Sequence, residues 1–169
     1  MNTKNKSLII AAVVILGSLG LILLTKPAPE VGGNFRADIS SAIVSEERSF
    51  DFGTISMASG DVSHDFKIRN GSGEVVKIER MYTSCMCTAA YFLKDGGGRI
   101  GPFGMPGHGG FVPPLKSVIE PGEETVISVV FDPAAHGPAG VGPVEREIYL
   151  EDESGNLIVV LGIKATVTP

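Results

Sequence analysis

The stretch Val62-Ser-His64-Asp-Phe66-Lys-Ile68, taken with the later run Thr125–Phe131 (TVISVVF), decides the fold of this chain. In the first stretch, apolar or aromatic side chains alternate with polar ones, and this period of two is typical of a β-strand with one buried face. The second is a run of mainly β-branched residues, which are enriched in strands. Both stretches therefore indicate sheet structure.

Turn signals divide the rest of the domain into short segments. The turns Asn70-Gly-Ser-Gly73, Glu120-Pro-Gly-Glu123 and Glu153-Ser-Gly-Asn156 consist of residues that favour turn conformations. No segment after the N-terminal region combines a period of 3.6 with helix caps. About seven short strands separated by turns predict an all-β protein, namely an antiparallel β-sandwich.

The first 26 residues differ from the rest of the chain. Lys4 and Lys6 precede an uncharged, apolar run at residues 7–25, and Lys26 closes that run. The run is long enough to span a membrane, so residues 1–26 are predicted to form a signal anchor with one N-terminal transmembrane helix. A cleaved signal peptide is the alternative. The lysines before the run favour a cytoplasmic N-terminus and an extracytoplasmic C-terminal domain, in the periplasm or at the cell surface.

Two further parts follow the predicted anchor. Residues 27–42 are polar and rich in Pro and Gly, which predicts a flexible linker, and residues 43–169 are expected to form the sandwich. Residues 94–116 are so rich in Gly and Pro that we expect a long loop, which is either functional or disordered. Beyond the anchor, eleven of the fourteen Lys and Arg residues stand against all nineteen Asp and Glu. This excess of acidic residues argues against nucleic acid as a partner.

Both cysteines of the chain, Cys85 and Cys87, lie one residue apart in the segment YTSCMCT at residues 82–88. In an extended strand the two side chains would project to the same face, with Met86 on the other. Their Cα atoms would then lie roughly 6.5 to 7 Å apart, at the limit of disulfide geometry. A disulfide between them would therefore need a bent backbone.

Three interpretations of the cysteine pair stay open. The first is structural, because buried cysteine packs as a small apolar residue. The second is a soft-metal site for Cu(I) or Zn(II), with Met105 and His108 from the Gly/Pro-rich loop as further ligands. The third is thiol–disulfide chemistry, although the sequence places neither a cation nor a helix N-terminus next to Cys85.

The remaining patterns do not indicate an enzyme. His64 lies in the alternating stretch, which favours a structural role, and His136 is expected to belong to a turn. The chain has no Gly-x-Ser-x-Gly elbow and no His-Glu-x-x-His helix, and its glycine-rich loop lacks a Gly-Lys-Ser/Thr ending. We therefore expect no catalytic residues.

Five motifs in a fixed order resemble the DUF1573 family, whose members are exported bacterial domains of unknown function. The motifs are FDFGTI at residues 50–55, HDFKIRN at 64–70, SCMCT at 84–88, IEPGE at 119–123 and GIKA at 162–165. The resemblance covers about Ser49 to Val167 and implies an immunoglobulin-like fold, similar to modules of the ASPM/SPD-2/Hydin type. The family usually has Gly where this chain has Met86, and its counterpart of the 94–116 loop is expected to be shorter.

Two functions are compatible with these observations. The first is a membrane-anchored, non-enzymatic binding or assembly module of the bacterial cell envelope. It would contact the membrane through residues 7–25, bind a cell-envelope protein and need no cofactor. The alternative is an extracytoplasmic copper- or zinc-binding protein that uses Cys85 and Cys87, with Met105 and His108 as possible additional ligands.

Overall fold

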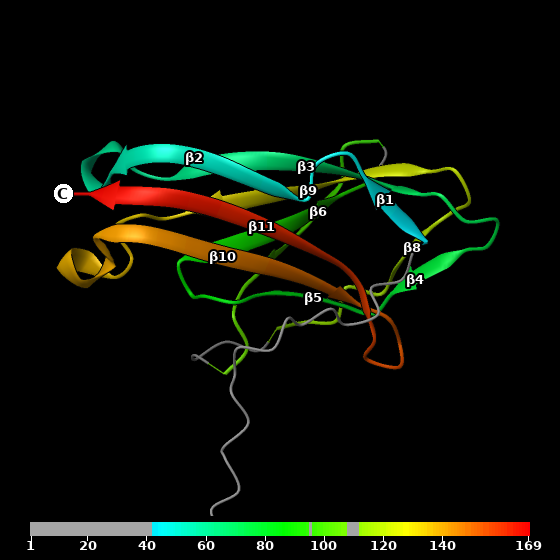
Figure 1. The fold of residues 1–169 in the computed structure, drawn as a ribbon. Helices are drawn as coiled ribbons and strands as arrows, with labels where there is room; N and C mark the ends of the chain where they lie inside the picture. The colour runs from blue at the N-terminus through cyan, green and yellow to red at the C-terminus, as the bar shows by residue number, and fades with distance from the viewer. Residues whose placement is uncertain (1–41, 95, 108–111) are drawn as a thin grey trace, which may run out of the picture. The chain divides into compact units, whose positions relative to one another are not determined.

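The computed structural model describes residues 42–94, 96–107 and 112–169 (Figure 1). The predicted transmembrane helix within residues 1–26, and all of the predicted linker except residue 42, lie outside the described residues. Among the residues that are described, no helix is long and apolar enough to cross a membrane.

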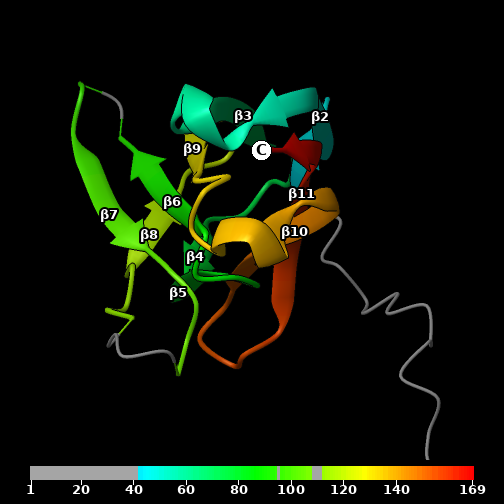
Figure 2. The same ribbon diagram turned by 90° about the vertical axis from the view of Figure 1, so that its left-hand side faces the viewer.

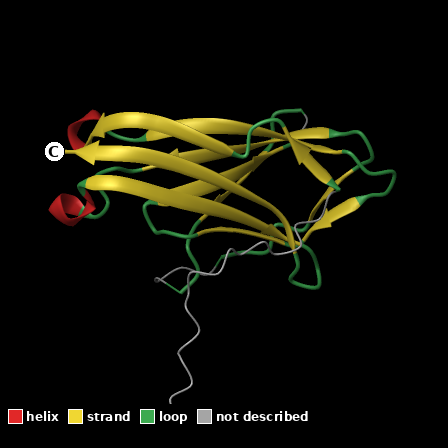
Figure 3. Cartoon of the chain, in the orientation of Figure 1, coloured by secondary structure: helices red, strands yellow, loops and turns green. Residues whose placement is uncertain are grey.

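The described residues form eleven strands and two short 3-10 helices (Figure 3). They are β1 (Ile43–Ser45), β2 (Ser49–Ser56), η1 (Met57–Ser59), β3 (Val62–Asn70), β4 (Val76–Ile78), β5 (Arg80–Thr83), β6 (Thr88–Leu93), β7 (Arg99–Phe103), β8 (Ser117–Ile119), β9 (Glu124–Phe131), η2 (Gly137–Gly140), β10 (Gly142–Glu151) and β11 (Leu157–Thr168). The prediction of an all-β protein is confirmed. The strands outnumber the expected seven because short pieces such as β1 and β8 carry no alternation long enough to detect.

The strands form two main sheets and one small ribbon (Figure 1). The five-stranded sheet has the order β1-β3-β9-β6-β7, the four-stranded sheet has the order β2-β11-β10-β5, and β4 pairs with β8. The expectation of purely antiparallel pairing is wrong for one pair, because β2 runs parallel to β11. After β1 pairs with β3 in one sheet, the chain changes sheet within three residues, and β2 then joins the last strand of the other.

Alternating side chains from both main sheets meet in one apolar core. In the five-stranded sheet Phe66, Ile127 and Val129 are buried, and in the four-stranded sheet Ile148 and Leu161 are buried. The five belong to the same cluster of packed side chains, as expected for a β-sandwich. The period of two that predicted β3 therefore also identified its buried residues Phe66 and Ile68.

The region at residues 94–116 is only partly a loop. Arg99–Phe103 forms β7, which pairs with β6 at the edge of the five-stranded sheet, and Phe103 is fully buried. Gly101 has φ +135°, and an added Cβ would approach the carbonyl oxygen of Ala90 to 2.9 Å. The glycine thus permits close strand packing here, which is why a composition that predicts a loop includes a strand.

Two connections cross between the main sheets at the same end of the domain (Figure 2). Residues 84–87 lead from β5 in the four-stranded sheet to β6 in the five-stranded sheet. The segment from Asp132 through η2 leads from β9 back to β10, in the opposite sense. Because Thr88 at the start of β6 pairs with Phe131 at the end of β9, the end of the first crossing lies beside the start of the second.

Candidate functional site

The two cysteines lie in the tight turn between β5 and β6, and not in an extended strand as the sequence analysis supposed. The backbone N–H of Thr88 donates to the carbonyl oxygen of Cys85 at 3.1 Å, which closes the turn. The two sulfurs nevertheless lie on the inner side, since Cys85 is 9% and Cys87 3% exposed, while Met86 is 59% exposed. Both cysteines are free thiols.

The buried hydroxyl of Thr83 holds this turn from beneath. Its oxygen lies 3.0 Å from the carbonyl oxygens of both Cys85 and Thr88, one on each side of the turn. The backbone N–H of Cys87 also approaches the sulfur of Cys85, at 3.4 Å. These local contacts fix the direction in which the two sulfurs point.

The second crossing connection brings His136 to the first thiol. The backbone N–H of Asp132 donates to the carbonyl oxygen of Cys87 at 2.9 Å, which attaches this connection to the cysteine turn. The exposed His136, immediately before η2, then places its Nε2 3.1 Å from the Sγ of Cys85. A residue expected only to form a turn therefore lies in hydrogen-bond contact with a thiol.

Strand β10 brings a cation to the second thiol. Backbone bonding between β5 and β10 continues past β5, because the N–H of Ser84 donates to the oxygen of Glu147 at 2.9 Å. The adjacent Arg146 turns inward, and its Nε donates to the Sγ of Cys87 at 3.2 Å. No cation is expected next to the cysteines from the sequence alone, because Arg146 is 59 residues away along the chain.

The two thiols differ in how readily they lose their protons. Burial alone raises the pKa of Cys85, but hydrogen bonds from Cys87 and His136, together with the charge of Arg146, lower that pKa overall to about 7. The pKa of Cys87 is raised by burial and by its hydrogen bond to Cys85, and the hydrogen bond from Arg146 offsets this only in part. Cys85 is therefore the thiol of the pair that loses its proton first.

The cluster formed by Cys85, Cys87 and His136 can hold a metal ion. Their three donor atoms, two sulfurs and one ring nitrogen, all lie within 4.8 Å of one another. Two thiolates and an imidazole form a soft donor set that suits copper and zinc. The alternative chemistry of the same arrangement is a reactive thiolate at Cys85, since a neighbouring histidine and cation are the usual means of lowering a thiol pKa.

The other predicted ligands have different positions. Met105 is half-buried and follows Gly104, whose carbonyl oxygen accepts a hydrogen bond from the N–H of Thr83. The segment that carries Met105 thus begins beside β5. His108 lies outside the described residues, so its place relative to the cysteines stays a prediction.

His64 is held by packing and one polar contact. Its ring stacks on Phe50 with centroids 3.7 Å apart, and its Nε2 lies 2.8 Å from a carboxylate oxygen of Glu47. Phe50 lies on β2 of the other main sheet, and Glu47 lies in the connection between β1 and β2, so these contacts join neighbouring parts of the sandwich, in keeping with the structural role expected for His64.

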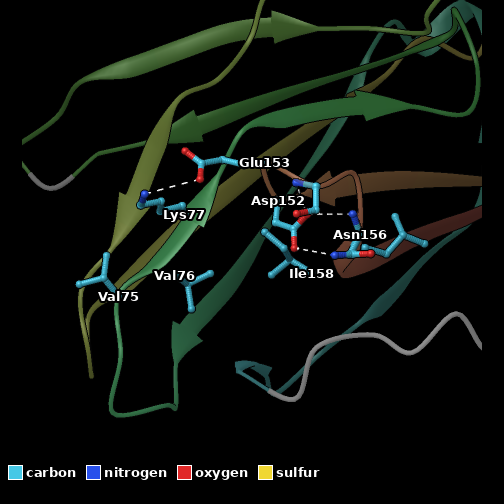
Figure 4. A pocket seen from close by; sticks show the side chains of 9 residues that line it. Val75, Val76, Lys77, Asp152, Glu153, Asn156 and Ile158 are labelled. Atoms are coloured by element: carbon cyan, nitrogen blue, oxygen red, sulfur yellow. Dashed lines mark hydrogen bonds and ion pairs between the residues drawn. The ribbon is translucent and has the colours of Figure 1, made fainter.

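A groove of about 540 Å³ lies beside the β10–β11 turn, away from the cysteines (Figure 4). Its polar groups bind one another. The carboxylate of Asp152 accepts hydrogen bonds from the N–H groups of Ser154 and Asn156 and from the side-chain amide of Asn156. Lys77 lies 3.5 Å from a carboxylate oxygen of Glu153. The size of this groove therefore does not make it the better candidate site.

Comparisons with known proteins address the family and the fold. The family model described as "Protein of unknown function (DUF1573)" matches residues 43–97, which include the cysteine turn. No curated protein matches the chain.

Two solved structures resemble the chain at low sequence identity. A protein of unknown function from Porphyromonas gingivalis W83 has 15% identity and a TM-score of 0.52 over 79% of this chain and 50% of that one. The SrpA adhesin from Streptococcus sanguinis has 16% identity and a TM-score of 0.29 over 74% of this chain and 56% of that one. The chain thus spans about half the length of these structures. The first likeness supports the fold, whereas the second has too low a TM-score to support it. Within residues 43–97 the chain matches the model of the DUF1573 family of proteins of unknown function, so this part of the chain is similar to that family.

Proposed function

We propose that this protein is a membrane-tethered, extracytoplasmic domain that binds a soft metal ion through Cys85, Cys87 and His136. The observation that carries the proposal is the convergence of their three donor atoms within 4.8 Å, from two connections far apart in the sequence. No catalytic step is assigned to the domain, so the proposed function is metal binding and not an enzymatic reaction.

The arrangement of the two cysteines is more typical of a binding site than of residues that only pack in the core. A cysteine that serves only as a small apolar residue needs no polar partner, yet each of these sulfurs lies within 3.2 Å of a nitrogen. The site is also accessible, because His136 is exposed at its mouth. An ion could therefore reach the two buried thiols from the side of η2.

The strand order supports an immunoglobulin-like domain as the carrier of the site. Strands β3, β9 and β6 neighbour one another as strands B, E and D do in that fold, and β11, β10 and β5 correspond to G, F and C. The segments β1 and β2 then divide strand A between the two sheets. The apolar run at residues 7–25, preceded by lysines, supports a tether that exports this domain.

Metal titration of the full chain, purified in detergent and reduced under anaerobic conditions, tests the proposal. Cu(I), supplied as its acetonitrile complex, and Zn(II) are each titrated against a chromophoric chelator. We expect one ion per chain, and we expect Cys85→Ser/Cys87→Ser to lower the affinity by more than about 100-fold. Met86→Leu, at an exposed thioether between the cysteines, is the matched control. Equal uptake by the wild-type protein and the double variant would refute the proposal.

A second candidate function is assembly with an envelope protein by strand addition. Strand β2 is an outer strand of the four-stranded sheet, with eight residues and no proline, whereas the outer strand β7 contains Pro102. An unpaired strand edge without proline can accept a strand from a partner. Thr54→Pro should abolish co-purification of a partner from membranes, while Ile100→Pro in β7 should not.

A further inference from the structure

We propose that Arg146 makes this site select a monovalent soft cation, Cu(I), over divalent zinc. The inference rests on the proposed metal-binding function and names the ion. Its basis is the direct contact between the guanidinium and one of the donor sulfurs, 3.2 Å from Nε to the Sγ of Cys87. Any ion bound by both thiols therefore lies close to a fixed positive charge.

The charges of the site favour an ion that carries one positive charge. When Cys85 and Cys87 bind an ion as thiolates and His136 is neutral, the donors carry two negative charges, and Arg146 contributes one positive charge. A monovalent ion makes this cluster neutral, whereas a divalent ion leaves a net positive charge beside buried sulfurs. A fixed charge repels a divalent ion twice as strongly as a monovalent one at the same distance.

The charge of Arg146 has no carboxylate partner among its neighbours on β10. The side chain of Glu145 pairs with Lys164 at 2.8 Å, and the side chain of Glu147 accepts a hydrogen bond from Tyr149 at 2.5 Å. The guanidinium instead donates to the backbone oxygen of Glu145 at 2.8 Å. It is thus held in place without being neutralised, and its field acts on the sulfurs.

The number of donor atoms also favours Cu(I) over zinc. Zinc almost always takes four ligands in structural sites, and the cluster in the described residues offers three. Soft thiolates favour Cu(I), for which three ligands are sufficient. Three such donors around one ion lie about 3.7 to 4.0 Å apart when the bond lengths are about 2.0 to 2.3 Å. The 3.1 Å contact between Cys85 and His136 then opens by less than about 1 Å on binding.

The test compares the affinity ratio of Cu(I) to Zn(II) in variants of the full chain. Arg146→Leu removes the charge and the hydrogen bond, Arg146→Gln removes the charge but keeps an N–H donor, and Arg146→Lys keeps the charge. Arg69→Leu, at an exposed position on β3, changes the net charge equally and is the matched control. Thermal unfolding of each variant shows that it is folded.

We expect the Leu and Gln variants at Arg146 to shift the ratio towards zinc by about tenfold or more. The Lys variant and the Arg69 control should retain the wild-type ratio. Unchanged ratios in both neutral variants would overturn the inference, even if every variant binds metal. The proposed function fails differently, since a wild-type protein without cysteine-dependent binding of either ion refutes it whatever Arg146 does.

Discussion

Two turns in this domain use polar side chains in opposite ways. In the β10–β11 turn, the carboxylate of Asp152 binds the N–H groups of Ser154 and Asn156 in the same turn. In the β5–β6 turn, the sulfurs of Cys85 and Cys87 face groups from other elements. A turn whose polar atoms bind one another needs no ligand to satisfy its hydrogen-bonding groups. The sulfurs of the cysteine turn have partners more than 45 residues away along the chain, and this arrangement gives the turn the capacity to bind an ion.

Among the single substitutions that separate the two turns, the largest effect is expected from the histidine that completes the cysteine cluster. His136→Ala removes one of three donors, so the affinity for Cu(I) should fall by about 10- to 100-fold. His108→Ala is the matched control, because it removes the histidine that the sequence alone favoured. Chelator competition under reducing conditions measures both. A larger loss from the His108 variant than from the His136 variant would show that the β9–β10 connection does not supply the third ligand.

The next effect concerns the hydroxyl beneath the cysteine turn. Thr83→Val conserves shape but leaves the carbonyl oxygens of Cys85 and Thr88 without this buried donor, so the free energy of unfolding should fall by about 1 to 3 kcal/mol. Denaturant unfolding of the metal-free protein measures the loss. Thr168→Val is the control, because its hydroxyl donates at 3.3 Å from a half-buried position. Equal stability of the Thr83 variant and the wild type would show that the turn needs no such support.

The opposite turn should respond in stability alone. Asp152→Ala removes three hydrogen bonds within an exposed turn, so the Tm should fall by a few degrees at most. The affinity for Cu(I) should stay at the wild-type value, because this turn lies away from the cysteines. A metal affinity that changes together with the Tm would show that the β10–β11 turn is not independent of the metal site.

The sequence alone predicts the sheet structure and one half of the candidate site. Alternation in Phe66 and Ile68, and the run at residues 125–131, identify buried strands, because a period of two follows directly from strand geometry. Spacing identifies Cys85 and Cys87 as a pair. His136 and Arg146 escape such reasoning, since only the pairing of β6 with β9 and of β5 with β10 brings them to the cysteines. Each also has an ordinary local interpretation, one as a turn residue and one as a strand residue.

The parallel pairing of β2 with β11 was also beyond the sequence. Residues 50–55 enter the sequence analysis only as a family motif, and the pattern of a strand does not determine which partner it joins or in which direction. Local patterns therefore indicate elements, whereas the site depends on the contacts between them.

The smallest effect separates Tyr82, in β5, from Cys85, in the turn that follows, by the response of each residue to pH. Burial, and then a hydrogen bond to Glu151, raise the pKa of Tyr82 from 10.0 to about 12. Because the folded pKa exceeds the unfolded one, this tyrosine contributes stability that is present below pH 10 and is lost as the pH rises through about 12. Ultraviolet titration of tyrosinate should lose its step near pH 12 in Tyr82→Phe. The Cys85 thiol, in the turn after β5, has a lowered pKa of about 7, so its stabilisation is complete above pH 9 and is lost as the pH falls through 7. Tyr82 and Cys85 are thus close in the sequence but have pH responses of opposite sign, and a Tyr82 step near pH 10 would remove that contrast.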